Sequence, residues 1–131
     1  MEIKIQQREG ICIITFNRPK DYNSFNKPMA MALQQTLDDC AKDDNIRAIM
    51  LTGEGKAFCA GQDLAEVTDP EGPELKSIVG EHYNPIISRI RSIEKPVLAA
   101  MTVVAAGAGA NIALAFAIVF AKKNSSFIPA F

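Results

Sequence analysis

The stretch GKAFCAGQDL, residues 55–64, decides how the rest of this sequence is interpreted. It follows IRAIMLTG (residues 46–53), an apolar run typical of a buried strand. Within it, the small residues Ala60 and Gly61 predict a turn shortly before the acidic residue Asp63. A second stretch, AAGAGANIAL (residues 105–114), repeats the pattern of small residues after another apolar run. Glycine and alanine leave the backbone accessible to a ligand, so two such turns could direct two N–H groups at one oxygen atom.

Residues 97–121 carry no charge, and three interpretations compete for them. A membrane span meets the length criterion of about 20 apolar residues, but Gly107, Gly109 and Asn111 stand at its centre. A dinucleotide-binding loop would need a third glycine and a later acidic residue, and the sequence has neither. A helix that begins near Ala108 would direct free N–H groups at a ligand. The alternative to this third interpretation is that the small residues only pack a helix tightly against a sheet.

The apolar pattern predicts strands that alternate with helices. Strands are expected on both sides of a Glu9-Gly10 turn within residues 3–19, at 46–53, at 95–101 and at 117–121. A first helix is expected to begin at an Asn26 cap with Pro28 in its first turn, and its apolar stripe is Met29, Leu33, Leu37 and Ala41. Two more helices are expected, one at 74–93 with a kink or break at Pro85 and one at 107–116 after a turn. Residues 54–74 are expected to form a long loop. This order predicts an α/β fold over residues 1–131, with largely parallel, buried strands.

Composition argues against several function classes. The net charge of −1 leaves no basic surface for nucleic acid, and 48% hydrophobic with 22% charged residues is ordinary for a globular protein. Cys12, Cys40 and Cys59 lie far apart and lack metal-binding spacing, which suits a reducing compartment. The polar N-terminus lacks an apolar export signal. We therefore expect a cytoplasmic protein with no metal, no nucleic-acid partner and no membrane anchor.

The last quarter of the sequence differs from the rest. After Lys95 the only charged residues are Lys122 and Lys123, and the sequence ends in the apolar run SSFIPAF (residues 125–131). Such an end is poorly suited to water unless something covers it. We therefore expect either a fragment or a chain that assembles with other copies.

Three motifs, in order, carry a resemblance to a known family. They are NRP at residues 17–19, GEGKAFCAGQDL at 53–64, and KPVLAA at 95–100 running on to AAGAGAN at 105–111. Together they make the sequence resemble the enoyl-CoA hydratase/isomerase (crotonase) family over essentially its whole length. The resemblance implies that residues 1–131 are the N-terminal part of a crotonase-like domain. That domain would be a spiral of ββα units, truncated before the family's C-terminal helical region, that assembles into trimers or hexamers.

The resemblance also implies an acyl-CoA ligand, in which coenzyme A is part of the substrate and no further cofactor is needed. The thioester carbonyl would lie between the N–H groups of Ala60 and Ala108, polarised toward an enolate. The expected substrate-binding residues are Ala60, Gly61, Gln62, Asp63 and Leu64 of the first stretch, Gly107 and Ala108 of the second, and Lys20 and Tyr22, which match positions near the adenosine end of coenzyme A.

One residue departs from the family pattern in a way that affects the chemistry. Family hydratases carry a catalytic glutamate at the position matching Asn111, and an asparagine amide cannot act as a general base. The run GANIAL resembles the subgroup that isomerises ring-derived acyl-CoAs, such as 1,2-epoxyphenylacetyl-CoA isomerases, whose single acid would lie beyond Phe131. We therefore predict a hydratase/isomerase-family protein that binds acyl-CoA, lacks the proton-transfer acid and is inactive alone. The alternative is a non-catalytic, self-associating module or an inactive truncated paralogue.

Overall fold

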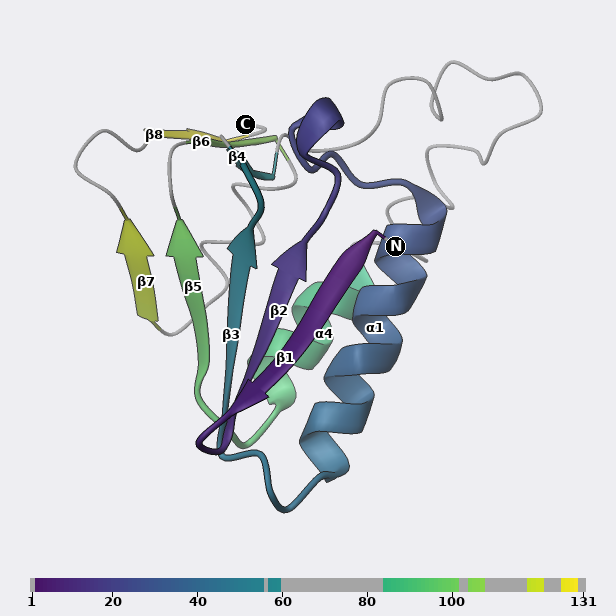
Figure 1. The fold of residues 1–131 in the computed structure, drawn as a ribbon, viewed down its shortest axis with the longest axis vertical. Coiled ribbons are helices and arrows are strands. Elements are labelled where there is room, and N and C mark those ends of the chain that lie inside the picture. The colour runs from purple at the N-terminus through teal and green to yellow at the C-terminus, as the bar shows by residue number, and fades with distance from the viewer. Residues whose placement is uncertain are drawn as a thin grey trace.

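The computed structural model describes residues 2–55, 57–59, 84–101, 104–107, 118–121 and 126–129. This part of the chain forms two sheets (Figure 1). The larger sheet has the strand order β1-β2-β3-β5-β7, made of β1 (Ile3–Arg8), β2 (Ile11–Phe16), β3 (Ala48–Gly53), β5 (Val97–Met101) and β7 (Ile118–Ala121). The smaller sheet has the order β4-β6-β8, made of β4 (Ala57–Cys59), β6 (Val104–Gly107) and β8 (Ser126–Pro129). Only β1 and β2 pair antiparallel among these strands, which confirms the largely parallel α/β class.

The β1–β2 hairpin turns at Glu9 and Gly10, as the sequence predicts. Both residues have positive φ, 52° and 84°, which is the backbone that a tight two-residue hairpin loop requires. A Cβ atom at Gly10 would stand 2.7 Å from Nε of Arg47, so any larger residue would also displace that guanidinium group. The turn therefore depends on glycine for its conformation.

Two helices, α1 (Lys27–Lys42) and α4 (Asn84–Ser92), cover one face of the larger sheet (Figure 1). Burial along β2 and β3 alternates, so every second residue of these strands faces the helices. The fully buried side chains of this core include Phe16, Phe25, Phe58, Ile14, Met29, Leu33, Leu37, Ile49, Leu51 and Ile86. The core thus lies between the helices and the sheet, as in other α/β proteins.

Helix α1 begins where the sequence predicts. The side chain of Asn26 accepts a hydrogen bond from the Met29 N–H (3.0 Å), and a proline lies in the first turn. The predicted apolar stripe is correct for Met29, Leu33 and Leu37 but wrong for Ala41, which is exposed. Cys40 takes the last buried place, because steps of four residues drift around a helix that has 3.6 residues per turn.

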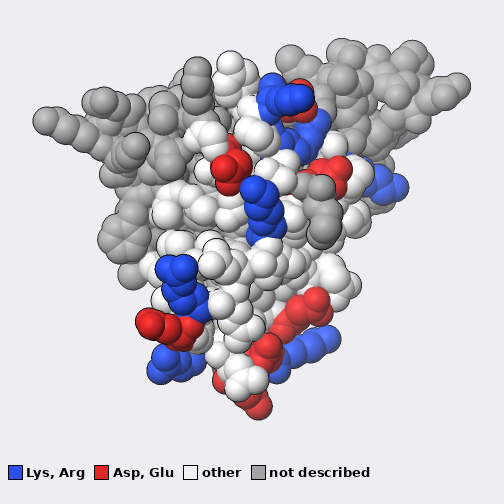
Figure 2. Space-filling view, viewed as in Figure 1, with Lys and Arg blue, Asp and Glu red and all other residues white. Residues whose placement is uncertain are grey.

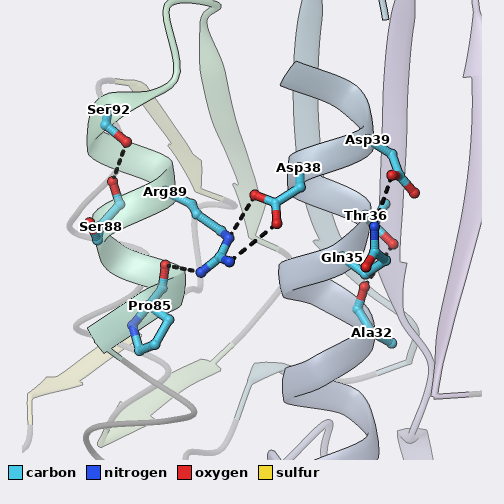
Figure 3. A network of polar contacts seen from close by, with 9 residues as sticks. All are labelled: Ala32, Gln35, Thr36, Asp38, Asp39, Pro85, Ser88, Arg89 and Ser92. Carbon is cyan, nitrogen blue, oxygen red and sulfur yellow. Dashed lines mark hydrogen bonds and ion pairs between the residues drawn. The ribbon is translucent and has the colours of Figure 1, made fainter. Parts of the chain in front are cut away.

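Helix α4 is tied to α1 by an ion pair (Figure 3). The Arg89 guanidinium donates to both carboxylate oxygens of Asp38, at 2.8 and 3.2 Å, and to the backbone oxygen of Pro85 at 3.1 Å. The helix runs without interruption from Asn84 through Pro85 to Ser92. Residues 74–83 of the predicted helix lie outside the described residues, so the break predicted at Pro85 is not tested on its N-terminal side.

The smaller sheet corrects three expectations. β4 lies inside the span that was predicted to be a loop, and the C-terminal run, for which no element was predicted, contains β8. Gly107 is the last residue of β6, where the sequence predicted the start of a turn and helix. These strands are short, and their residues do not alternate between apolar and polar, which is the pattern that reveals a strand.

Candidate active site

The smaller sheet brings together the chain segments that lead to the two expected N–H donors. β4 and β6 are parallel neighbours, with Ala57 paired to Val104 and Cys59 to Ala105. Because neighbouring parallel strands run the same way, their carboxyl ends lie at the same edge of the sheet. Ala60 is the next residue after β4, and Ala108 is the next residue after β6.

Most of the expected site residues lie outside the described part of the chain. These are Ala60, Gly61, Gln62, Asp63, Leu64, Ala108 and Asn111. Gly107 is described through its backbone, in β6, where it pairs with Pro129 of β8. The described residues therefore include the strands that precede the two expected donors and the loops that hold those strands.

Lys20 and Tyr22 belong to the short 3-10 helix η1 (Pro19–Asp21) and its C-terminal cap. Both residues are exposed, Tyr22 to 56%. Figure 1 shows that η1 lies at the end of the larger sheet toward which β2 and β3 point, the end at which the smaller sheet also lies. The expected adenosine-end residues and the strands that lead to the expected donors are thus found at one end of the molecule.

A network of polar contacts closes the loop that follows β2. Asn23 is completely buried and has φ of 57°, and its Oδ1 accepts a hydrogen bond from the Arg18 N–H at 2.7 Å. The Arg18 side chain donates to the carbonyl oxygen of Ser24 and forms an ion pair with Asp21 at 3.1 Å. The loop therefore has a fixed shape, with Tyr22 turned outward. The sequence pattern indicated no role for Asn23, although asparagine is a common turn residue.

The same loop holds the corner between β3 and β4. Asn23 Nδ2 donates to the carbonyl oxygen of Glu54 at 2.9 Å, while the Glu54 N–H donates to the carbonyl oxygen of Phe16 at 2.9 Å. Gly55 follows with φ of 80°, and a Cβ atom there would approach Cβ of Pro19 to 3.1 Å. The glycine at position 55 is therefore needed for the corner to pass close to Pro19.

Three buried phenylalanines hold β4 from the apolar side. The Phe16 ring centroid lies 5.4 Å from that of Phe25 and 5.2 Å from that of Phe58 in β4, with the rings steeply inclined. Such inclined ring pairs are favourable contacts. All three side chains are fully buried. The last strand residue before Ala60, Cys59, is buried as well, which agrees with a packing role.

Lys95, in the motif KPVLAA, has a structural role that the sequence did not reveal. Its Nζ donates to the carbonyl oxygens of Cys40 (2.7 Å) and Asp43 (2.8 Å), at the C-terminal end of α1. A cation is favourable there because the helix dipole is negative at that end. Burial, followed by hydrogen bonding with Cys12 that favours the protonated thiol, raises the pKa of Cys40 to about 12, so Cys40 is unsuited to act as a nucleophile.

The face of the molecule that Figure 2 shows is mixed in charge. Figure 2 shows positive and negative residues interspersed on the visible face, not gathered by sign. Two of the pairs are Lys4–Glu54 at 3.7 Å and Arg18–Asp21 at 3.1 Å.

Within the described residues, no cluster of three or more His, Cys, Asp or Glu side chains could hold a metal ion. No helix among them is long and apolar enough to cross a membrane.

Known proteins resemble this chain in both sequence and fold. A sequence model of the family described as enoyl-CoA hydratase/isomerase matches residues 6–131. The chain is 44% identical over 126 residues to a 1,2-epoxyphenylacetyl-CoA isomerase of Escherichia coli, covering 94% of this chain and 48% of that protein. It is 42% identical over 129 residues to a probable enoyl-CoA hydratase of Rhodobacter capsulatus, covering 98% of this chain and 49% of the relative.

The solved structure of an enoyl-CoA hydratase of Mycobacterium smegmatis superposes with a TM-score of 0.90 at 27% identity, covering 97% of this chain and 50% of that one. The chain spans about half the length of the curated relatives it matches. The fold and the sequence thus agree, and the chain belongs to the enoyl-CoA hydratase/isomerase (crotonase) family.

Proposed function

We propose that this chain binds an acyl-CoA and polarises its thioester carbonyl between the backbone N–H groups of Ala60 and Ala108. The observation that supports this most is the parallel pairing of β4 with β6. The two alanines directly follow these strands in the sequence, so their amides are candidates to converge on one oxygen atom.

The chemistry of such a site is electrostatic. Negative charge grows on the thioester oxygen when a proton leaves the α-carbon or when a nucleophile adds to the acyl group. Two fixed N–H donors stabilise that charge without having to reorient. Removal of one donor of this kind raises the barrier by about 2.7–4 kcal/mol, or roughly 10²–10³-fold in rate.

We propose that the rest of the acyl-CoA contacts the chain on both sides of these donors. The segment Gly61, Gln62, Asp63 and Leu64, together with Gly107, would line the pantetheine and acyl portions. Lys20 and Tyr22 would contact the adenosine end, and their exposure at the end of the fold where the smaller sheet lies supports this assignment. Coenzyme A is then part of the substrate, and no further cofactor enters the proposal.

The residue at position 111 bears on the reaction class. Asn111 cannot accept a proton, so a hydration that relies on a carboxylate at that position is disfavoured. The relative that is 44% identical is a 1,2-epoxyphenylacetyl-CoA isomerase. We therefore favour isomerisation of a ring-derived acyl-CoA, with the proton-transfer acid supplied outside residues 1–131. Residues 1–131 alone would then bind and polarise the thioester without turning it over.

We propose in addition that the chain works as a cytoplasmic homo-oligomer, a trimer or a hexamer. The apolar run 125–131 supports association, since an apolar end of this kind is poorly suited to water unless something covers it. Light scattering of the purified chain tests this: a monodisperse monomer would contradict it. An oligomer that shows no affinity for any acyl-CoA would instead favour the alternative of a non-catalytic assembly module.

The decisive experiment measures polarisation directly. Benzoyl-CoA carrying ¹³C at the thioester carbonyl has no α-hydrogen, so it reports binding without reacting. We expect calorimetry to detect binding, and infrared spectroscopy to find the labelled carbonyl band at lower frequency when bound. Absence of heat at millimolar benzoyl-CoA, or a bound band at the frequency of the free thioester, would end the proposal.

Two variants of position 60 sharpen the test. Ala60→Pro removes the N–H group itself and should reduce the shift of the bound carbonyl band. Ala60→Ser keeps the N–H group and should retain that shift. Equal shifts in the two folded variants would show that the Ala60 amide is not a donor to the thioester.

A further inference from the structure

We propose that Asn23 is a positioning residue for the acyl-CoA site: its side-chain amide fixes the corner between β3 and β4 and thereby aims β4 toward the thioester. The inference rests on the proposed function, because it assigns a role to the strand that leads to Ala60. Asn23 is completely buried and would act only through β4.

The contacts of Asn23 span two segments that are far apart in the sequence. Its Oδ1 accepts from the Arg18 N–H, its Nδ2 donates to the carbonyl oxygen of Glu54, and its own N–H donates to the carbonyl oxygen of Arg18 at 2.8 Å. One side chain therefore links the loop after β2 to the first residue after β3. A buried amide that is paired on both sides resists displacement, because each broken bond would leave a polar group buried without its partner.

Asparagine meets both demands of this position. The φ of 57° lies in the left-handed region, which asparagine tolerates better than most residues. The two contacts also need an acceptor and a donor on the same short side chain. Aspartate would keep the acceptor toward Arg18 but would face the Glu54 carbonyl oxygen with a second acceptor.

The corner connects Asn23 to β4, so the position of Asn23 affects the direction of β4. Glu54 is held at its N–H by Phe16 and at its carbonyl oxygen by Asn23, so both peptide groups that flank Glu54 have a fixed orientation. Gly55 then passes against Pro19, and β4 begins at Ala57. Only five residues separate Glu54 from Ala60. A rotation of the corner would therefore change the direction in which the chain leaves β4.

Packing and positioning can be separated at this corner. Phe58 anchors β4 to Phe16 through ring contact, independently of Asn23. Loss of the Asn23 amide should therefore leave β4 packed on the core while its end becomes misdirected. The expected signature is a thioester that still binds but is less polarised.

The test uses the full chain and ¹³C-labelled benzoyl-CoA, with two variants of position 23. Asn23→Gly deletes both side-chain contacts and suits the left-handed backbone, so it should fold; Asn23→Asp deletes only the donor to Glu54. We expect both variants to lose most of the low-frequency shift of the bound carbonyl, while Kd rises by no more than about threefold, a change of about 0.65 kcal/mol.

Thr36→Ala is the matched control. Thr36 is also buried, and its hydroxyl donates to the Ala32 carbonyl oxygen at 2.8 Å within α1, away from the corner. The control should lose stability but keep the full carbonyl shift. If it loses the shift as well, the effect is one of general stability and the inference is overturned.

The remaining outcomes are distinguishable from one another. A wild-type chain that neither binds nor shifts the thioester refutes the proposed function, and the inference fails with it. A wild-type shift that persists undiminished in Asn23→Gly overturns the inference and leaves the proposed function intact. If Asn23→Gly does not fold, the carbonyl shift in Asn23→Asp decides by the same criterion.

Discussion

Strands β2 and β3 of the larger sheet and strand β6 of the smaller sheet are built from different kinds of residue. In the larger sheet, aliphatic side chains such as Ile14, Ile49 and Leu51 are fully buried against the helices. In the smaller sheet, β6 consists of one valine, two alanines and a glycine, and it is joined to β4 and β8 by parallel backbone pairing. The larger sheet is thus a scaffold held by side chains. Strand β6 of the smaller sheet offers mainly backbone, which is what a thioester oxygen would require.

The largest expected effect comes from Phe16, because its ring contacts both Phe25 and the Phe58 ring of the smaller sheet. Phe16→Ala should lower the free energy of unfolding by about 3–5 kcal/mol. Phe16→Leu, which keeps much of the apolar volume, should lose less than roughly half of that. Chemical denaturation measures both losses. A loss from Phe16→Ala no larger than that of Phe16→Leu would mean that the ring does not connect the two sheets.

A smaller effect is expected from Lys95, which stabilises the scaffold and not the smaller sheet. Lys95→Met keeps an apolar stem but removes the two charged hydrogen bonds to the end of α1. The free energy of unfolding should fall by about 1.5–3 kcal/mol. Lys42→Met, at an exposed position of the last turn of α1, is the control and should change it by less than about 0.5 kcal/mol. Equal losses in the two variants would contradict the role assigned to Lys95.

The smallest effect is expected at the Asp38–Arg89 pair between α1 and α4. The hydrogen bond from Arg89 holds the pKa of the Asp38 carboxyl below its ordinary value of 3.8. This carboxylate therefore stabilises the fold above that ordinary pKa, and the stabilisation is lost as pH falls through the lowered value of the folded state. Because the Asp38 side chain is 41% exposed, solvent screening limits the contribution to less than about 1 kcal/mol.

Asp38→Asn tests that pH dependence. The variant should be less stable than the wild type at pH 7, and the difference should vanish when the pH falls below the lowered pKa of Asp38. Denaturation curves across this range measure it, with Asp39→Asn as the control because Asp39 contacts Gln35 on its own helix. A stability difference that is the same at neutral and acidic pH would show that the ion pair does not carry it.

The larger sheet could be predicted from the sequence because its signals are local. The Glu9-Gly10 turn and the Asn26 cap each depend on neighbouring residues, and both are confirmed. The one error in the stripe of α1 has a geometric cause. Counting from Met29, Ala41 falls about 120° away from the stripe, whereas Cys40 returns to within about 20° of it.

The smaller sheet and its supports could not be predicted, because their signals are not local. β6 reads as a run of small residues that suits a turn or a helix as well as a strand. Asn23 binds the backbone carbonyl oxygen of Glu54 at the corner that leads to β4. In the scaffold, Lys95 was missed for the same reason, since it binds the carbonyl oxygens of Cys40 and Asp43, and the identity of a residue does not reveal that its backbone oxygen is a partner. The positions of the two proposed donors stay a prediction, since Ala60 and Ala108 lie outside the described residues.

The parallel order of the strands has a consequence for how the chain folds during synthesis. Among the described strands, only β1 and β2 are joined by a tight turn; β2 cannot pair with β3 until Ala48 has been synthesised, and β3 cannot pair with β5 until Val97 has been synthesised. Pairings of such distant segments form slowly and leave strand edges open meanwhile. A ribosome must therefore release most of residues 1–131 before the scaffold can close, so the nascent chain has a long interval in which a chaperone could shield those edges.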